Sequence, residues 1–411
     1  MKVLLLKDYF LPENCAGINL TNDLLEAIAK SGNEAEVFTP IPCRGINDEI
    51  RKEYRYKKKE VLYDGKVIVH RYWLPYEKKN IVSRALRYLL QNVIQIIKAV
   101  RCDYDIAFLG STPPTMGIVG TIIKKFKKKP FVFNVQDVFP DSLVTTGITE
   151  KGSLIWKFGN WISDKSYDNA DKIITISNSM KENLIMKGVP ENKLLTIHNW
   201  IDADVIKPID KTDNYLFDEL NLPREKFYVV YAGNLGNAQG AEVIIDAAKL
   251  LKDNLDIHFV IFGNGTKKEE IESKILNEKL NNISLFNLRP SKDVPYVYSL
   301  GNISIITCKK GTGEAGLPSK TWSILATATM PIVCFDLNSD LSKLIIENNL
   351  GIAIEPEDSK SLKEAIEVAY SDEKKCVAMG QNGRKLVEKY YSKTYCTSKY
   401  IEALKEVIAK K

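Results

Sequence analysis

The chain has 411 residues, of which 45% are hydrophobic and 27% are charged, and it carries a formal net charge of +6. This length suits two domains of ordinary size, and the apolar fraction argues against disorder over most of the chain. The positive charge is too small to indicate nucleic-acid binding, but it is compatible with anionic phosphate substrates or an anionic membrane face.

Cysteine and histidine usage bears on redox compartment and metal binding. Seven cysteines are scattered without a C-x-x-C pair, and only three histidines are present. This pattern favours free thiols in a reducing cytosol and argues against a zinc site. The start of the chain, in which Lys7 follows a short apolar run, is unlike a signal peptide, and no apolar run reaches the ~18 residues of a membrane-spanning helix. We therefore expect a protein that is soluble or lies on a membrane surface.

The N-terminal half alternates predicted strands and helices. Residues 3–6 indicate a buried strand, the loop D-Y-F-L-P-E-N-C-A-G ends at Gly17, and residues 19–30 indicate a helix. Residues 44–63 are highly charged, and we expect an exposed, poorly fixed excursion there. Repeated strand–helix units predict a doubly wound sheet with ligands at the carboxyl ends of its strands. The other strands expected in this half are 66–72, 36–39, 105–109, 131–135, 172–176 and 194–197, with helices at 154–169 and 179–187.

Residues 81–101 form the longest predicted helix, with apolar residues every three or four positions and basic residues among them. The favoured interpretation is a helix whose apolar face packs in the core and whose basic edge is solvated. The alternative is a basic amphipathic helix that rests on anionic lipid. The lysine-rich segment 124–129 in the same half of the chain supports that alternative.

The C-terminal half repeats the strand–helix pattern after a polar, proline-bearing segment at 201–224, which we interpret as an interdomain linker. Glycine loops follow the predicted strands at 228–231 and 258–262. The pattern predicts two α/β domains of similar size with a cleft between them. The other strands expected here are 283–286, 303–307, 332–335 and 352–354.

The stretch 311–336 combines a glycine loop, a helix-compatible segment at 322–328 that Pro331 ends, and a buried strand. Backbone N–H groups that open onto a helix N-terminus attract anions, and Lys320 adds a full positive charge. The stretch is therefore either a pocket for a phosphorylated ligand or an ordinary strand–loop–helix connection.

Other ligand motifs are weak. Gly263 and Gly265 follow a strand, but Lys268 stands where a G-x-G-x-x-G fingerprint needs its third glycine, and no P-loop motif occurs. The sequence thus argues against an NAD-linked dehydrogenase. The D-x-D from Asp202 to Asp204 resembles a metal motif of nucleotide-sugar enzymes, although a capped turn is the favoured interpretation.

Phosphate could instead be held by backbone amides of the two glycine loops, at 233–236 and 311–316, together with Lys320 and Arg289. Asp137, in Q-D-V-F-P-D, ends a predicted strand of the first half. Its carboxylate could accept a proton or hydrogen-bond a sugar hydroxyl, or it could cap a helix.

These motifs, in order and over nearly the whole chain, resemble family 4 glycosyltransferases. That family has the GT-B fold, an α/β architecture in which two Rossmann-like domains face each other across a cleft. The chain is most similar to the bacterial O-antigen and capsule branch, including transferases of N-acetyl-fucosamine and related amino sugars. The motifs are Y-F-L-P-E-N-x-A-G, V-Q-D-V-F-P-D-S-L, I-T-I-S-N-S-M-K-E-N-L, I-H-N-W-I-D, Y-A-G-N-L-G, V-I-F-G-N-G and L-P-S-K-T-W-S-I-L-A.

The resemblance implies an acceptor-binding domain at 1–200, the linker at 201–224, a nucleotide-sugar-binding domain at 225–390, and a C-terminal helix at 391–411 that packs back on the first domain. It implies retaining transfer of a sugar, an N-acetylated amino sugar, from a UDP-sugar donor to a lipid-diphosphate-linked saccharide. The expected location is the cytoplasmic face of the cell membrane. No metal and no cofactor besides the UDP-sugar co-substrate is expected, and no nucleic-acid partner.

The resemblance also implies roles for individual residues. Gly17 lets the first loop approach the reaction centre, Asp137 lies on the acceptor side, and Lys320 stabilises the leaving diphosphate. The implied donor-binding residues are Gly233, Asn234, Leu235, Gly263, Asn264, Gly265, Arg289, Glu314, Gly316, Leu317, Pro318, Ser319 and Lys320.

The chain departs from the family pattern at two positions. Many members carry a second glutamate where Ser323 stands, and the usual Arg/Lys pair of the first donor loop is replaced by Asn234 and Gln239. The missing second glutamate slightly favours one alternative, a donor-binding subunit without catalysis. The other alternative is a different enzyme on the same fold, like UDP-N-acetylglucosamine 2-epimerase.

Overall fold

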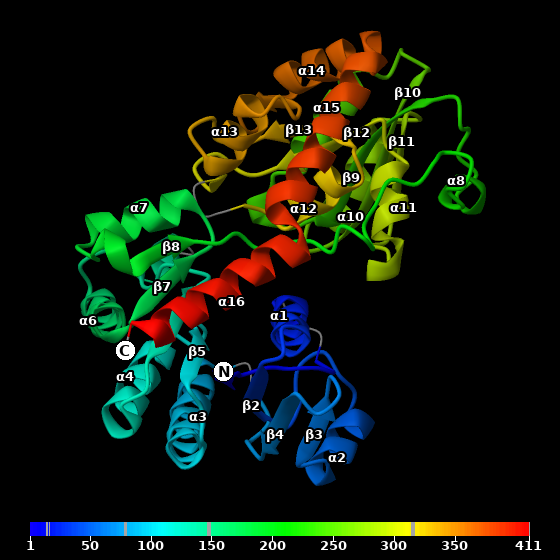
Figure 1. Cartoon of the computed structure of the whole chain (residues 1–411). Coiled ribbons are helices and arrows are strands. Elements are labelled where there is room, and N and C mark those ends of the chain that lie inside the picture. The colour runs from blue at the N-terminus through cyan, green and yellow to red at the C-terminus, as the bar shows by residue number, and fades with distance from the viewer. Residues whose placement is uncertain (14, 16, 78–79, 146–148, 314–316, 411) are drawn as a thin grey trace. The chain divides into compact units, whose positions relative to one another are not determined.

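The computed structural model describes residues 1–13, 15, 17–77, 80–145, 149–313 and 317–410. It divides into two compact units (Figure 1): unit 1 comprises Met1–His198 and Cys396–Lys411, and unit 2 comprises Asn199–Tyr395. Each unit is built on a sheet whose strands are parallel, apart from one edge strand of unit 1, and helices pack against both sheets. The predicted class, two α/β domains of the Rossmann type, is confirmed.

The sheet of unit 1 has eight strands among the described residues, in the order β3-β4-β2-β1-β5-β6-β7-β8. Only β3 runs antiparallel to its neighbour. The order changes direction at β1, which pairs with β2 on one side and β5 on the other, so that its carboxyl end is a topological switch point. The strands are β1 (Lys2–Leu6), β2 (Glu34–Pro40), β3 (Lys59–Leu62), β4 (Val67–Tyr72), β5 (Ile106–Gly110), β6 (Phe131–Val135), β7 (Lys172–Thr175) and β8 (Leu194–Thr196).

The helices of unit 1 begin where polar side chains cap them. The side chains of Asn80, Ser153 and Ser177 each accept a hydrogen bond from a backbone N–H of the first helical turn that follows. The helices are α1 (Ile18–Lys30), α2 (Asp48–Tyr56), α3 (Ile81–Arg101), α4 (Met116–Lys127), α5 (Asp141–Thr145), α6 (Leu154–Asn169), α7 (Asn178–Met186) and the C-terminal α16 (Lys393–Ala409).

The sheet of unit 2 has six strands in the described chain, in the order β11-β10-β9-β12-β13-β14. Alternate residues of β9 enter two separate cores: Val229 and Tyr231 pack with α9, α10 and α14, whereas Val230 packs with α11, α12 and α13. This period of two is what a strand buried on both faces requires. The strands are β9 (Phe227–Asn234), β10 (Ile257–Asn264), β11 (Ile283–Phe286), β12 (Ile303–Thr307), β13 (Met330–Cys334) and β14 (Ile352–Ile354). The helices are α8 (Leu216–Glu219), α9 (Glu242–Leu250), α10 (Lys268–Asn277), α11 (Val294–Ser299), α12 (Lys320–Ala326), α13 (Asp340–Glu347), α14 (Ser359–Ser371) and α15 (Glu373–Leu386).

The charged segment 44–63 is not the loose excursion that we expected, because it contains α2 and β3. Arg51 is buried, and its guanidinium donates hydrogen bonds to the carbonyl oxygens of Pro42 at 2.6 Å and Leu74 at 3.1 Å. These partners lie outside the segment, so its local charge density gave no sign of them. Similarly, the segment 201–224 interpreted as a linker lies within unit 2, whose core includes Leu216, Phe217 and Leu222.

The last helix, α16, returns to unit 1. Tyr400 is buried there, with its hydroxyl 3.3 Å from Oδ1 of Asn134 at the end of β6, and its ring packs edge-on against Phe108 of β5. Residues from Cys396 onward therefore cluster with the first domain rather than with the second.

Helix α3 spans the predicted residues, but the favoured interpretation of its faces is wrong. Arg87 is buried, whereas Leu86, Leu89 and Val93 are exposed. The apolar stripe therefore points away from the core. None of the helices in the described part of the chain has the length and apolar composition needed to cross a bilayer.

Candidate nucleotide-sugar site

The glycine loops of unit 2 meet at the carboxyl edge of its sheet. Strands β9 and β10 pair in parallel to their last residues, which places Gly233 beside Gly263 and Asn234 beside Asn264. The backbone N–H of Leu235 donates a hydrogen bond to the carbonyl oxygen of Asn264 at 2.8 Å. The two predicted donor loops are thus held together at the edge where open α/β sheets bind ligands.

The glycines are needed for packing between these loops. A Cβ on Gly265 would lie 2.5 Å from the carbonyl oxygen of Leu235, and one on Gly263 would lie 2.6 Å from Cγ of Leu235. A Cβ on Gly233 would lie 2.9 Å from Nζ of Lys320. Leu235 is completely buried, and its carbonyl oxygen accepts a hydrogen bond from the backbone N–H of Lys267 at 2.8 Å, so this residue holds the two loops together from beneath.

Lys320 is the first residue of α12, and its ammonium group is buried. Its Nζ is buried 4.1 Å from the ring centroid of Tyr231, and no hydrogen-bond acceptor among the described residues reaches it. Burial lowers the pKa of Lys320 to about 8. The Tyr231 hydroxyl in turn donates to the carbonyl oxygen of Asn234 at 2.8 Å, which links the ammonium group to the first glycine loop. A buried ammonium without a partner is costly, and an anionic ligand would relieve that cost.

Helix α12 contributes less than the sequence suggested. It has only seven residues, and its N-cap Ser319 is exposed and makes no capping hydrogen bond. Leu317 and Pro318 are half-buried just before it, whereas the predicted residues Glu314 and Gly316 lie outside the described residues. The positive charge of Lys320 therefore matters more here than the dipole of this short helix.

Two amides of the loop that was expected to hold phosphate already have a partner. Backbone N–H groups of Gly311, at 3.0 Å and 3.1 Å, and Gly313, at 2.8 Å, donate to the carboxylate of Asp336, which follows β13. The amides of Gly311 and Gly313 are therefore occupied by a carboxylate of the chain itself, whereas those of 314–316 lie outside the described residues, and phosphate binding by this loop stays a prediction. Sequence reasoning gave Asp336 no role, although it directly follows the expected strand 332–335; a carboxylate in that position is the signal that it missed.

Arg289 follows β11 and is held in ion pairs. Its guanidinium contacts both carboxylate oxygens of Glu219, at 2.7 Å and 3.1 Å, and it contacts Asp293 at 3.0 Å. These carboxylates raise the pKa of Arg289 further. Its predicted contact with the donor base stays a prediction, and any such contact would have to share the guanidinium with two carboxylates.

The predicted residues of unit 1 lie at the carboxyl ends of its strands. Gly17 caps α1 with φ of 79°, and a Cβ there would find no described atom within 4 Å, so the space beside it is open. Asp137 follows β6 and is exposed, yet the atoms crowded around its carboxyl group desolvate it and raise its pKa. Helix α5 begins only at Asp141, so Asp137 does not cap it, and the predicted contact of Asp137 with a sugar hydroxyl stays a prediction.

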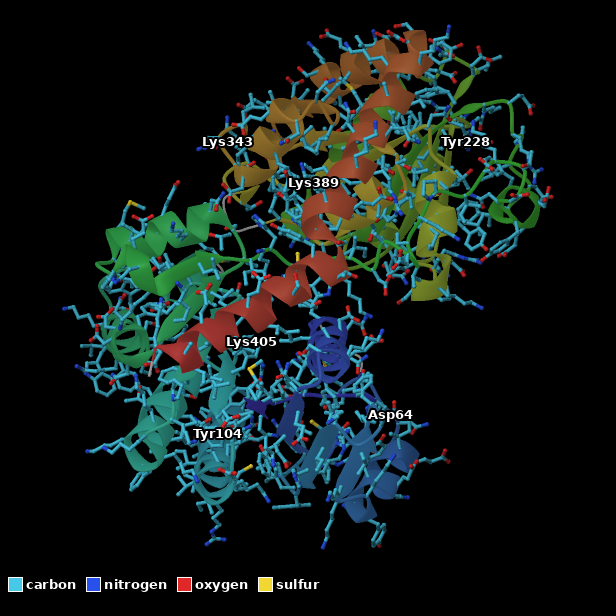
Figure 2. All side chains as sticks on the ribbon, viewed as in Figure 1. Asp64, Tyr104, Tyr228, Lys343, Lys389 and Lys405 are labelled. Carbon is cyan, nitrogen blue, oxygen red and sulfur yellow. The ribbon has the colours of Figure 1, made fainter. Side chains whose placement is uncertain are left out.

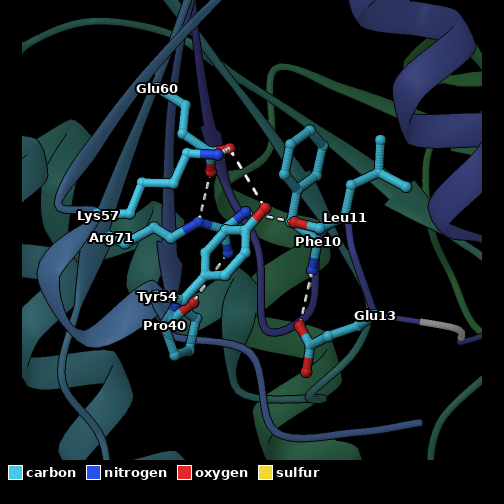
Figure 3. Close-up of polar contacts among 8 residues, drawn as sticks. All are labelled: Phe10, Leu11, Glu13, Pro40, Tyr54, Lys57, Glu60 and Arg71. Carbon is cyan, nitrogen blue, oxygen red and sulfur yellow. Dashed lines mark hydrogen bonds and ion pairs between the residues drawn. The ribbon is translucent and has the colours of Figure 1, made fainter. Parts of the chain in front are cut away.

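The loop between β1 and Gly17 is fixed by a buried ionic network (Figure 3). Arg71 of β4 contacts Glu60 at 2.6 Å and donates to the carbonyl oxygen of Leu11 in the loop. Glu13 accepts hydrogen bonds from the backbone N–H groups of Phe10 at 3.0 Å, Cys43 at 2.8 Å and Arg44 at 3.0 Å. Sequence reasoning missed Glu13 and Arg71, since their partners lie up to 60 residues away.

Replacing Glu13 by glutamine is expected to lower the free energy of unfolding by about 1–3 kcal/mol, because an amide NH₂ would face backbone donors that the carboxylate now satisfies. Thermal unfolding followed by circular dichroism measures the change. Glu49→Gln, at an exposed position in α2, is the matched control and should leave stability within about 0.5 kcal/mol. Equal stability of the two variants would contradict the proposed anchoring.

The structure assigns the D-x-D motif to a turn. Oδ1 of Asp202 accepts hydrogen bonds from the backbone N–H groups of Asp204 at 3.2 Å and Val205 at 3.3 Å, as the favoured interpretation required. Within the described ranges, no three His, Cys, Asp or Glu side chains are grouped so that they could hold a metal ion.

Comparison with known proteins places this architecture in a class. Residues 19–205 match the family model described as Glycosyltransferase Family 4, and residues 213–386 match the model Glycosyl transferases group 1. The two models together cover most of the chain, in the same order as the two units. The chain therefore belongs to the family 4 glycosyltransferases with the GT-B fold.

Particular relatives are distant in sequence but similar in length. The chain is 27% identical over 381 residues to the putative colanic acid biosynthesis glycosyl transferase WcaI of Escherichia coli (strain K12), covering 90% of this chain and 92% of the relative. It is 22% identical to the probable glycosyltransferase WbjE of Pseudomonas aeruginosa, covering 81% and 82%. The solved structure of Anabaena Alr3699/HepE has a TM-score of 0.73 at 15% identity, covering 99% of this chain and all of that one, and so supports the fold alone.

Proposed function

We propose that this glycosyltransferase moves a sugar, an N-acetylated amino sugar, from a UDP-sugar donor to a lipid-diphosphate-linked saccharide in the synthesis of a surface polysaccharide. The observation that carries the donor assignment is the buried ammonium of Lys320, which lies against the glycine loop at Gly233 and lacks a partner among the described residues. A diphosphate supplies the negative charge that this position lacks.

The comparisons also support a nucleotide-sugar donor and a role in polysaccharide biosynthesis. Solved structures of the similar Anabaena Alr3699/HepE contain UDP, UDP with glucose, and UDP-glucose. WcaI and the Staphylococcus aureus protein CapM are described as glycosyltransferases of colanic acid and capsular polysaccharide biosynthesis. The amino-sugar donor and the O-antigen or capsule product rest on the sequence resemblance.

In the proposed reaction the acceptor hydroxyl attacks the anomeric carbon as the bond to the UDP oxygen breaks, and the acceptor proton passes to the leaving diphosphate. Retention of configuration follows if attack and departure take place on the same face of the sugar. The ammonium of Lys320 stabilises the charge that develops on the diphosphate. Asp137 binds an acceptor hydroxyl, and Gly17 leaves room for the donor and acceptor to approach.

A panel of UDP-sugars, incubated with the protein and a lipid-diphosphate-linked saccharide, tests the proposal. The expected product is an acceptor heavier by one sugar, with the anomeric configuration of the donor by NMR and with the same yield in EDTA. Conversion of one UDP-sugar into another without acceptor would indicate the epimerase. UDP binding without any product over the whole panel would indicate a non-catalytic donor-binding subunit.

A further inference from the structure

Helix α3 (Ile81–Arg101) exposes a stripe of apolar residues to solvent and buries several polar side chains, while Ile94, Ile96 and Ala99 pack in the core of unit 1. The residues buried along it include Arg87, Gln91 and Gln95. Its outward-facing residues are apolar and follow helical spacing. These exposed residues are Val82, Leu86, Leu89, Leu90, Val93 and Ile97, with exposed fractions between 41% and 66%. We call these six residues the α3 stripe. A helix in a globular protein normally has the opposite orientation.

Hydrogen bonds fix this orientation. The side chain of Arg87 donates to the carbonyl oxygen of Pro75 at 3.1 Å, Gln95 donates to that of Lys7 at 3.2 Å, and Asn92 donates to the Thr115 hydroxyl at 2.7 Å. A rotation of α3 that buried the stripe would break all three contacts and expose their partners. The stripe is therefore a stable part of the surface of unit 1, and it is one of the contiguous exposed apolar patches that mark interaction sites.

Basic residues outnumber acidic ones beside the stripe, although Glu77 pairs with Arg84 at 3.1 Å and Asp103 is exposed next to the end of α3. Residues 81–102 and 106–136 contain no aspartate or glutamate. Arg101 is exposed at the end of α3, and Lys125 and Lys128 are exposed at the end of the neighbouring α4, on either side of the exposed Phe126. Figure 1 shows α3 and α4 side by side, in agreement with their contacts. The exposed aromatic residues Trp73 and Tyr76 precede α3, and such residues favour the membrane interface.

We propose that the α3 stripe, with this basic end of α3 and α4, docks unit 1 on an anionic lipid bilayer. An apolar helix face, an excess of basic residues at one end, and flanking aromatics are together the features of an interfacial helix. A protein partner would be expected to match the cationic groups with carboxylates, whereas anionic headgroups match them over the whole surface. This inference rests on the proposed function for its purpose, since a lipid-linked acceptor would then lie at the surface on which the enzyme docks.

The test measures binding of the full chain to vesicles by sedimentation, with phosphatidylglycerol mixed into phosphatidylcholine and with phosphatidylcholine alone. The double variant Leu86→Asp/Val93→Asp should bind the anionic vesicles at least about tenfold more weakly, because it places carboxylates on the docking face. The matched control is Leu276→Asp/Val368→Asp, at exposed helical positions of unit 2, and it should bind like the original chain. Circular dichroism confirms that both variants are folded.

The contribution of the basic residues to vesicle binding has its own test. Arg101→Gln should weaken binding to the anionic vesicles by about fivefold and leave binding to phosphatidylcholine unchanged, since one basic residue near such a surface contributes ~1 kcal/mol. Equal binding by the stripe variant and its control would overturn the proposal. So would a chain that dimerises through the stripe in light scattering but does not bind vesicles.

Failure of docking and failure of the proposed function are distinguishable. UDP affinity, measured by calorimetry without lipid, tests the donor site alone, whereas vesicle binding without UDP tests the α3 stripe alone. A chain that binds vesicles through the stripe but transfers no sugar would keep the inference and overturn the proposed function.

Discussion

Lys320→Ala should bind UDP about 10- to 150-fold more weakly than the original chain, because a hydrogen bond assisted by a full charge contributes about 1.5–3 kcal/mol. Titration calorimetry with UDP measures the loss. Lys343→Ala is the control, since Lys343 is an exposed lysine of α13 in the same unit (Figure 2), and it should leave the affinity unchanged. An unchanged affinity in Lys320→Ala would remove Lys320 from the donor site.

The affinity for UDP should depend on pH through the protonation of Lys320. Burial lowers the pKa of Lys320 to about 8 in the free protein, and a bound anion would raise it again. UDP binding therefore takes up a proton above pH 8, and the affinity should fall by up to about tenfold per pH unit as the pH rises beyond that value. Between pH 7 and pH 9 the phosphate charge of UDP is nearly constant. Lys320→Ala should show no such fall, and a parallel fall in both proteins would contradict this origin.

The buried ammonium of Lys320 also makes the protein without ligand less stable. The folded pKa of Lys320 lies below its ordinary value of 10.5, so the unfolded chain binds the proton more tightly. This destabilisation is complete below about pH 8, and it is relieved as the pH rises toward 10.5. Lys320→Met should therefore melt at a higher temperature than the original chain at pH 7, while it loses UDP affinity. Such a trade-off is expected at a binding site and not at a structural lysine.

Gly265→Ala is expected to lower the free energy of unfolding by about 2–5 kcal/mol and to weaken UDP binding as well. Its φ of 155° is unfavourable for a residue with a Cβ, and that Cβ would lie 2.5 Å from the backbone oxygen of Leu235. The overlap between this Cβ and the Leu235 oxygen can be relieved only if the two glycine loops separate. That separation would move Gly233 relative to Lys320. Thermal unfolding and UDP calorimetry measure the two effects.

Gly311→Ala is the control for conformational strain. It lies in the same unit with φ of 77°, and a Cβ there would meet no described atom within 4 Å. It should cost about 1–2 kcal/mol, which is the penalty of a left-handed residue alone. If the two alanine variants were equally stable, close packing between the loops would not be the reason for glycine at position 265.

Much of the architecture could be predicted from local sequence. Apolar runs of strand length, separated by amphipathic helices, predicted the two α/β domains, and the hydrophobic periodicity predicted the ends of α3. The strands β9 and β10 were predicted in the right places, but they run on through Gly233 and Gly263, which were expected in the loops after them. These features depend on residues within one turn or one strand of each other.

What the sequence could not decide depends on partners far along the chain. Asp336 takes the amides of a loop about 25 residues before it, Glu219 pairs with Arg289 across 70 residues, and Tyr231 lies against the ammonium of Lys320. Periodicity defined both faces of α3, but only the tertiary structure showed that the polar face is the buried one. Amphipathic spacing shows only that a helix has two different faces. Which face turns inward depends on the hydrogen-bond partners that Arg87 and Gln95 find on other segments of the chain.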